Sequence, residues 1–517
     1  MSEKLFRSTA IVSIMTFISR ILGFVRDIVI ARMFGAGLGA DVFFVAFKIP
    51  NFLRRLFAEG AFSQAFIPVL AEYRERGDRD LKELIANTSG TLAGMLFVIT
   101  AIGIFIAPIL IMIFAPGFIQ NPHKIELAGD LLKITFPYLF FISLTALAGS
   151  ILNSFGKFAI PAFTPVFLNL SLIACAIWLS PQLGQPVTAL AWGVFIGGLV
   201  QLLFQIPFLL EIKHLPKPRW GWKDSGVQQI LKLMIPAMFG VSVAQINLLL
   251  DTILASFLAT GSISWLYYSD RLVEFPLGIF GIALSTVILP SLSKKHASAS
   301  KAEFSHTIDW ALRWVFIIGT PAAIGLIWLA EPLLLTLFQY GEFMPSDAHY
   351  ASQSLMAYGL GLLPFIFIKV LAPGYYARQD TKTPVKIGII AMVTNMVLNI
   401  ILMMQFAHVG LALATSLSAM LNAGLLYIGL RKLGVYQPVA GWGRFIVKLI
   451  VANACLLALL IFLTPMTSEW LEWTALHRAG VLSSLIVCAA VIYFVMLALV
   501  GVKIKTFLKP YSSVDLS

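Results

Sequence analysis

Long apolar stretches recur along the whole chain and are separated by short polar segments. A helix needs about 20 predominantly apolar residues to cross the hydrocarbon core of a bilayer, and these stretches are of that order. The pattern predicts an all-α integral membrane protein with about fourteen transmembrane helices. The expected spans are residues 8–34, 41–72, 84–115, 127–152, 160–180, 187–212, 226–258, 265–293, 304–330, 348–376, 384–405, 409–431, 443–464 and 478–501.

Composition supports this class, because 59% of the residues are hydrophobic and only 12% are charged, with a mean hydropathy of +0.89. Soluble domains carry about 25% charged residues. The net charge of +12 is typical of cytoplasmic loops that face anionic membrane lipids, so we expect no nucleic-acid partner. Cys175, Cys455 and Cys488 fall in apolar stretches without a CxxC spacing, which argues against a disulfide framework or a zinc site.

Lysine and arginine gather in alternate loops. By the positive-inside rule both termini are therefore cytoplasmic and the number of spans is even. The first apolar stretch lacks a small-residue cleavage site and is expected to remain as a span. The basic loops include Arg74, Arg76, Arg79 and Lys82, then Lys213, Lys217, Arg219 and Lys223, and finally Lys503, Lys505 and Lys509.

An internal repeat divides the chain. AFSQAFIPVL at 61–70 aligns with ALSTVILPSL at 283–292, and NSFGKFAIP at 153–161 aligns with YARQDTKTP at 376–384, both at offsets of about 222 residues. We therefore expect two six-helix lobes, residues 1–222 and 223–440, followed by two additional helices and a cytoplasmic tail in 441–517. Because each half holds an even number of spans, the axis that relates the lobes runs along the membrane normal, which is compatible with alternating access. An old duplication in a static protein is the alternative.

Ionisable side chains lie inside several spans, where a charge at mid-membrane depth costs about 2.5 to 3.5 kcal/mol. Such residues normally face a water-filled cavity or one another. In the first span Arg20 and Asp27 share a helical face, while Arg26 points elsewhere. The second span carries a polar stripe of Asp41, Lys48, Arg55 and Glu59, and the eighth begins with Ser264, Asp270, Arg271 and Glu274, where Arg271 and Glu274 are an i, i+3 pair.

Two interpretations of these charges stay open. Arginine is suited to bidentate capture of phosphate, so a cavity rich in arginine predicts an anionic, phosphorylated substrate. Alternatively, the charges are structural ion pairs between helices. The sequence contains no GxxxxGK[ST], no metal-spaced histidines and no GxSxG, so neither ATP hydrolysis nor another catalytic activity is predicted.

A second polar group lies in other spans. Asp251 follows an apolar run, Asn395 and Asn399 are spaced i, i+4, and Thr415 lies in the next span. Hard oxygen ligands of this kind favour a monovalent cation, which predicts coupling to Na⁺ or H⁺. Equally, the asparagines and the threonine are typical of hydrogen bonding between membrane helices.

Five sequence runs resemble those of the MurJ (MviN) lipid II flippases, within the superfamily of multidrug, oligosaccharidyl-lipid and polysaccharide exporters. The runs are SRILGFVRD at 19–27, FGAGLGADVFFVAFKIPNFLRR at 34–55, FAEGAFSQAFIP at 57–68, YYSDRLVEFP at 267–276 and APGYYARQDTKTP at 372–384. The resemblance implies transfer of lipid II, an undecaprenyl-pyrophosphate-linked disaccharide-pentapeptide, to the outer leaflet of the bacterial inner membrane for peptidoglycan synthesis, without a cofactor.

By matching position, the resemblance also implies residue roles. Arg20, Arg26 and Arg271 would bind the pyrophosphate and head group. Asp41, Arg54, Glu59, Ser264 and Glu274 would line or gate the cavity, and Asp251, Asn395, Asn399 and Thr415 match a sodium site less securely. The last two helices would form a groove for the lipid tail, and cell-wall synthesis or division proteins are candidate partners. Export of drugs or of other lipid-linked sugars, and a non-transporting cell-wall scaffold, remain the alternatives.

Overall fold

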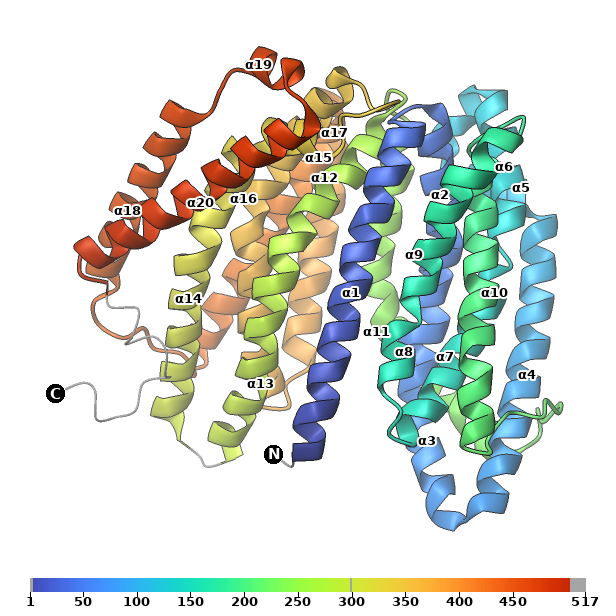
Figure 1. Cartoon of the computed structure of the whole chain (residues 1–517). Helices are drawn as coiled ribbons and strands as arrows, with labels where there is room; N and C mark the ends of the chain where they lie inside the picture. Colours follow the sequence, from blue (N-terminus) through green and yellow to red (C-terminus); the bar gives the residue numbers. More distant parts are fainter. Residues whose placement is uncertain (1–2, 298–299, 503–517) are drawn as a thin grey trace. The chain divides into compact units, whose positions relative to one another are not determined.

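A computed structural model describes the backbone of residues 3–297 and 300–502, and their side chains except at 3–10, 57–60, 239–244, 282–283, 286–287 and 295–297. Within these residues every regular element is a helix, as the hydropathy pattern predicts (Figure 1). The chain forms two compact units. One comprises Met1–Ser264 with Tyr340–Phe343, and the other comprises Trp265–Gln339 with Met344–Ser517.

The first unit contains eleven α-helices and four short π- or 3₁₀-helices among the described residues. They are α1 (Glu3–Phe34), α2 (Leu38–Arg54), η1 (Arg55–Phe62), α3 (Ser63–Arg76), α4 (Asp78–Phe105), α5 (Ala107–Phe114), η2 (Pro116–Gln120), α6 (Pro122–Thr135), α7 (Tyr138–Ser154), α8 (Ala159–Phe163), α9 (Pro165–Ala174), η3 (Cys175–Leu179), η4 (Ser180–Gln182), α10 (Thr188–Glu211) and α11 (Ser225–Ala255).

Helix α12 (Ser262–Pro276) begins in the first unit and continues into the second. The other helices of the second unit are η5 (Leu277–Gly281), α13 (Ile282–Ala297), α14 (Lys301–Trp328), α15 (Ala330–Leu337), α16 (Pro345–Tyr376), α17 (Lys382–Lys432), α18 (Trp442–Leu463), α19 (Thr467–Glu472) and α20 (Ala475–Leu499).

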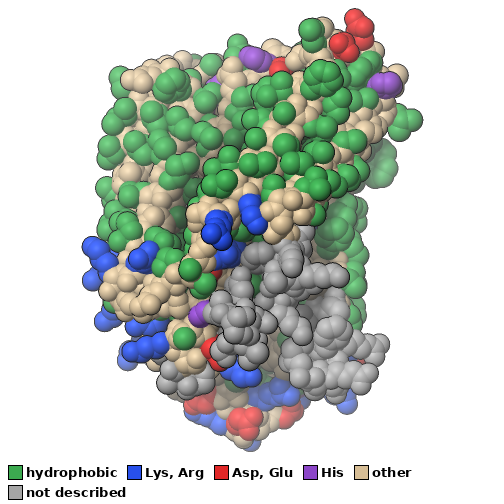
Figure 2. All heavy atoms as spheres, turned by 90° about the vertical axis from the view of Figure 1, so that its left-hand side faces the viewer, with side chains coloured by type: hydrophobic (Ala, Val, Ile, Leu, Met, Phe, Trp, Pro, Cys, Tyr) green, Lys and Arg blue, Asp and Glu red, His purple; other side chains and the backbone are tan. Residues whose placement is uncertain are grey.

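Nine helical segments of the described chain are long and apolar enough to cross a membrane. They are Asp78–Phe105, Pro122–Ser154, Ala159–Gln182, Thr188–Glu211, Lys301–Trp328, Pro345–Tyr376, Lys382–Lys432, Trp442–Leu463 and Ala475–Leu499. The face shown in Figure 2 carries a broad area of hydrophobic side chains, with Lys and Arg gathered toward its lower end. Apolar surface of this extent needs a lipid solvent, which agrees with a multi-span membrane protein.

Local sequence explains the starts of two helices. Helix α11 begins after Asp224, whose carboxylate accepts hydrogen bonds from the backbone N–H groups of Gly226 and Val227. Helix α6 begins after Asn121 with Pro122 at its first position, where the missing N–H of proline is not needed. These side chains satisfy or avoid backbone donors that the first turn leaves unpaired.

Two expected spans, 384–405 and 409–431, run together as α17. The backbone leaves the helical conformation at Ala407, with φ +49° and ψ −128°, so the helix has a break where the sequence predicts a loop. The expected second span, residues 41–72, is not one continuous α-helix in the structure. Helix α2 continues through Pro50 and is followed by the π-helix η1, which carries Arg55 and Glu59.

Candidate functional site

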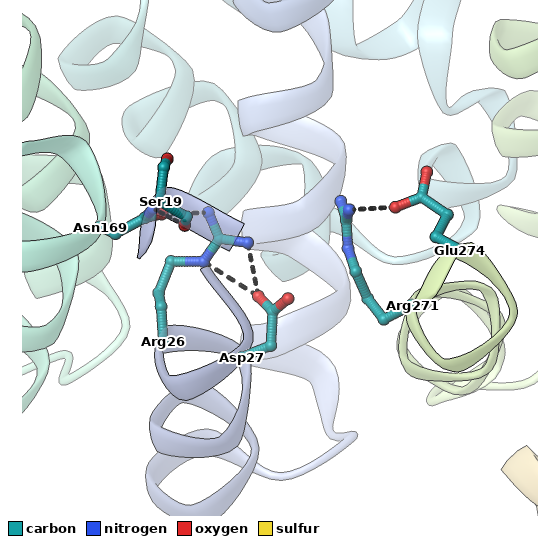
Figure 3. A network of polar contacts seen from close by, with 6 residues as sticks. All are labelled: Ser19, Arg26, Asp27, Asn169, Arg271 and Glu274. Atoms are coloured by element: carbon teal, nitrogen blue, oxygen red, sulfur yellow. Dashed lines mark hydrogen bonds and ion pairs between the residues drawn. The ribbon is translucent and has the colours of Figure 1, made fainter. Parts of the chain in front are cut away.

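The α1 side chain Arg26 lies in a polar network within the first unit (Figure 3). Its Nε and Nη2 donate to Asp27 Oδ1 at 2.9 and 2.6 Å, and its Nη1 donates to Asn169 Oδ1 at 2.9 Å. The Asp27 side chain is 2% exposed and that of Arg26 is 13% exposed. The expectation that Arg26 points away from Asp27 is wrong, because the long arginine side chain reaches back to its neighbour.

Arg20 lies two helical turns earlier on α1 and is exposed. Among the described side chains it has no hydrogen bond or ion pair. The exposed guanidinium of Arg20 can offer its N–H donors to an anionic ligand or a lipid head group.

Helix α2 places Asp41 in the interior of the first unit, where it is 2% exposed. Its carboxylate accepts hydrogen bonds from Gly261 N at 2.6 Å and from Ser264 N and Oγ at 2.9 and 2.6 Å. The structure therefore brings together two of the predicted cavity or gate residues that are far apart in sequence. Arg54 is half-buried at the end of α2 and donates from Nε to Asn51 Oδ1 at 2.9 Å.

The polar stripe expected along the second span requires correction. It assumed α-helical spacing as far as Glu59, but residues 55–62 form a π-helix, in which the wider turn places side chains at different angles. The side chain of Glu59 lies outside the described residues. The backbone is α-helical from Asp41 to Arg54, so Asp41, Lys48 and Arg55 keep the expected heptad spacing, whereas the placement of Glu59 on the same face stays a prediction.

Arg271 and Glu274 lie on α12 within the second unit and form the predicted i, i+3 pair, with Nη1 and Oε2 2.6 Å apart (Figure 3). Their side chains are 33% and 51% exposed, and exposed pairs contribute only about 0 to 1 kcal/mol. The Arg271 guanidinium also lies 4.8 Å from the centre of the Tyr267 ring. A partly exposed guanidinium in such a weak pair can exchange the carboxylate for a phosphate.

The candidate cation ligands are divided between the two units. Asp251 is half-buried near the end of α11, whereas Asn395, Asn399 and Thr415 all lie on α17. Asn395 and Asn399 are fully buried, and Ser418 Oγ lies 3.4 Å from Asn395 Oδ1. Thr415 Oγ1 donates to the Leu411 carbonyl within its own helix. The contact between Ser418 and Asn395 agrees with hydrogen bonding between helix segments, whereas that of Thr415 is local, and the cation site remains a prediction.

Two residues that the sequence analysis did not select belong to these networks. Asn169 of α9 accepts from Arg26 and donates to the Ser19 carbonyl at 3.2 Å. Lys124 is only 8% exposed and donates to Thr260 Oγ1 at 2.8 Å. An asparagine within an apolar run was a usable signal for Asn169, because amides inside spans usually have a partner. Lys124 looked like an ordinary loop charge.

Comparison with known proteins identifies the family. A family model described as lipid II flippase MurJ matches residues 30–479. The chain belongs to the MurJ family. It is 55% identical over 98% of both chains to a probable lipid II flippase MurJ of Vibrio cholerae. It is also 43% identical to the lipid II flippase MurJ of Burkholderia cenocepacia, over 97% of this chain and 99% of that one.

Solved structures agree with this family assignment. A lipid II flippase MurJ in an inward closed conformation superposes with a TM-score of 0.79 at 28% identity, covering 94% of this chain and 98% of that one. An inward-facing multidrug resistance MATE transporter of the MOP superfamily superposes with a TM-score of 0.65 at 14% identity, covering 80% and 94%. At that identity the second likeness concerns the fold alone.

Proposed function

We propose that this chain flips lipid II from the inner to the outer leaflet of the bacterial inner membrane by alternating access, and supplies peptidoglycan synthesis. The observation that carries the proposal is a set of arginines on helices of a MurJ-family chain: Arg20 and Arg26 on α1, and Arg271 on α12. Its family is one of flippases, so the proposed activity is transport and not catalysis.

Physical chemistry supports this assignment. A pyrophosphate-sugar head cannot cross hydrocarbon unaided, because its charges and hydroxyls would lose their hydration without replacement. Guanidinium groups replace part of that hydration with charge-assisted, bidentate hydrogen bonds. Outward movement of a negative head is also favoured by an inside-negative membrane potential, by about 2.3 kcal/mol per charge per 100 mV.

The experiment is complementation of a strain depleted of its own flippase, combined with leaflet-resolved labelling of lipid-linked precursor. Arg20→Ala, Arg26→Ala and Arg271→Ala should each abolish growth while protein remains in the membrane. Arg76→Ala is the matched control, because Arg76 is exposed at the end of α3, where it pairs with Glu72 and lies over the Tyr73 ring. Arg271→Lys keeps the charge without the bidentate geometry and should restore little activity.

Each alternative has its own outcome in this experiment. Normal growth of all three alanine variants would favour a non-transporting scaffold. A precursor pool that stays accessible from outside after depletion would contradict the flippase assignment and favour export of another substrate.

The overall organisation of the transporter is also proposed. We take the chain to have about fourteen spans, arranged as two six-helix lobes, residues 1–222 and 223–440, with two further helices after residue 440. Both termini are proposed to be cytoplasmic, from the loop charges. Reporter enzymes fused to each end test this orientation, and activity of a periplasm-dependent reporter at either terminus would contradict it.

The two C-terminal helices α18 and α20 provide a candidate groove for the lipid tail. A cavity of about 470 Å³ is lined mostly by apolar side chains of these helices, with His477 and Ser484 as its polar members; the lining includes Leu463, Val481 and Cys488. An open apolar groove fits a polyprenyl chain, which gains from burial of each methylene. Ser484→Trp should fill the groove and weaken binding of lipid II at least tenfold, while binding of a soluble head-group analogue stays unchanged. Equal weakening of both ligands would contradict a tail-specific groove.

The proposed transport is coupled to a cation. The buried carboxamides of Asn395 and Asn399 and the carboxylate of Asp251 are oxygen donors that suit Na⁺, and the carboxylate also suits H⁺. Precursor flipping in proteoliposomes should then accelerate with an imposed Na⁺ or H⁺ gradient, and Asp251→Asn should remove that acceleration. Flipping that responds to membrane potential alone would contradict cation coupling.

A further inference from the structure

The chain passes from the first compact unit to the second through residues 256–264, here called the α12 entry segment. It follows α11, ends in the first turn of α12, and leads into the helix that carries Arg271. Three hydrogen-bonding anchors from the first unit hold this segment. One of them uses a buried lysine to which the proposed transport mechanism assigns no role.

The first anchor is Asp41. Its carboxylate accepts from the backbone N–H groups of Gly261 and Ser264, at 2.6 and 2.9 Å, and from the Ser264 hydroxyl at 2.6 Å. Asp41 therefore caps the amino end of α12 from another helix. An anion at that end satisfies unpaired backbone donors and interacts favourably with the helix dipole.

The second anchor is Lys124 of α6. Its ammonium donates to Thr260 Oγ1 at 2.8 Å and lies 5.2 Å from the centre of the Phe118 ring. Burial of an ammonium is costly unless the group is hydrogen bonded or paired. Thr260 immediately precedes Gly261, so Lys124 and Asp41 hold adjacent residues of one turn.

The third anchor comes from the 3₁₀-helix η2. The Gly117 N–H donates to Ser256 Oγ at 3.0 Å at the start of the entry segment. A methyl group at Gly117 would lie 2.2 Å from the Ser256 carbonyl oxygen, so only glycine allows this approach. The entry segment is thus held at its start, at residue 260 and at the first turn of α12.

We propose that Lys124 is a positioning residue for α12, and that its bond to Thr260 keeps the entry segment where Asp41 can cap the helix that carries Arg271. The consequence for transport rests on the proposed function, whereas the positioning itself does not. Lys133 lies on the same helix α6 as Lys124 but is 45% exposed and forms a surface pair with Asp130 at 2.9 Å.

Hydrogen exchange of the full chain in detergent or nanodiscs tests the positioning role. Lys124→Met should reduce protection of the Gly261 and Ser264 amides about tenfold, because a hydrogen bond from a charged donor is lost. Lys133→Met, which removes the same charge from the same helix, should change protection by less than twofold. Lys124→Arg retains a donor and should recover part of the protection. Unchanged protection in Lys124→Met would overturn the proposal.

Thr260→Val provides a second test of the same hydrogen bond in case Lys124→Met does not fold. Thr260→Val removes the other partner of the same bond, and its loss of protection should match that of Lys124→Met without adding to it in the double variant. Fully additive losses would overturn the proposal, because the two side chains would then act separately. Thr260→Ser keeps the hydroxyl and should behave as the unmodified chain.

Leaflet-resolved flipping by the same variants completes the test. Lys124→Met should lower the flipping rate about tenfold, and Lys133→Met should not change it. Loss of amide protection with a normal flipping rate would overturn the role in transport and leave the flippase assignment intact. If the unmodified chain flips no precursor, the proposed function fails, while hydrogen exchange still decides the positioning role.

Discussion

At the scale of single residues, the guanidinium of Arg26 is held by two different partners. The Asp27 carboxylate supplies the negative counter-charge. Asn169, 143 residues away from Arg26, supplies a neutral hydrogen-bond acceptor at 2.9 Å. The same carboxamide donates to the Ser19 carbonyl, so Asn169 joins α9 to two positions on α1. Asn169 orients the guanidinium without adding a second negative charge beside Asp27, so it fixes the direction of the Arg26 N–H donors without further charge compensation.

Replacement of Asn169 should therefore affect binding of the anionic head. Asn169→Leu keeps the size but removes the acceptor, and should weaken binding of lipid II about tenfold, which corresponds to about 1.4 kcal/mol. Asn169→Asp keeps an acceptor but adds a negative charge, and should weaken binding by repelling the diphosphate even though Arg26 stays in place. Native mass spectrometry of the purified protein measures the affinity of each variant for lipid II. Wild-type affinity in Asn169→Leu would contradict a role of Asn169 in binding the head group.

At the scale of elements, the break in α17 is a strained connection between two helical segments. Ala407 has φ +49° and ψ −128°, a backbone conformation that residues with a Cβ rarely adopt. Gly410 lies just beyond, where a methyl group would come within 2.2 Å of the Leu402 carbonyl oxygen. Ala407 is therefore strained at the break, whereas the close approach of the chain at Gly410 requires a glycine.

These two positions should respond to substitution in opposite directions. Ala407→Gly should stabilise the protein by about 1 kcal/mol, because strain at this backbone conformation is relieved. Gly410→Ala should destabilise it, because the backbone of residue 402 must move to make room. Thermal unfolding in detergent, followed by helical circular dichroism, compares both variants with the unmodified chain. A lower midpoint for Ala407→Gly would contradict the strain argument.

Element boundaries could be predicted from the sequence only where the signal was local. The break near residue 407 separates two apolar stretches, so hydropathy located it. The π-helix at 55–62 was not predicted, because its apolar and charged residues have no spacing that distinguishes a π-helix from an α-helix. The α-helical spacing expected from Asp41 to Glu59 therefore holds only as far as the start of this π-helix, and the Glu59 side chain lies outside the described residues.

At the scale of the whole molecule, a buried carboxylate in the second unit binds the connection between α17 and α18. Asp309 of α14 is fully buried and accepts from Tyr436 Oη at 2.9 Å, Val439 N at 3.1 Å and Trp442 Nε1 at 2.7 Å. Its second oxygen accepts from Arg313 Nε at 2.8 Å. These bonds attach the connection between α17 and α18 to α14. They thereby position the start of α18, one of the two helices of the candidate tail groove, against α14.

Loss of the Asp309 carboxylate should lower the stability of the protein strongly. Asp309→Ala leaves Arg313 buried without its counter-charge and should destabilise the protein by about 3 to 5 kcal/mol. The double replacement of Asp309 and Arg313 by leucine should cost less, because no uncompensated charge remains. Thermal stability of the two variants in the same detergent compares them, and a larger loss in the double variant would contradict a role for the ion pair.

The sequence by itself determined that the chain is helical and spans a membrane, and which helices carry charge. These properties follow from residue type and spacing along a single segment, since hydropathy, length and proline or glycine positions act locally. The tertiary structure decided which polar groups meet: Arg26 with Asn169, Lys124 with Thr260, and Asp41 with a helix that begins 221 residues later. Buried polar groups must find partners wherever the fold brings a donor and an acceptor together, and neither hydropathy nor periodicity carries that information.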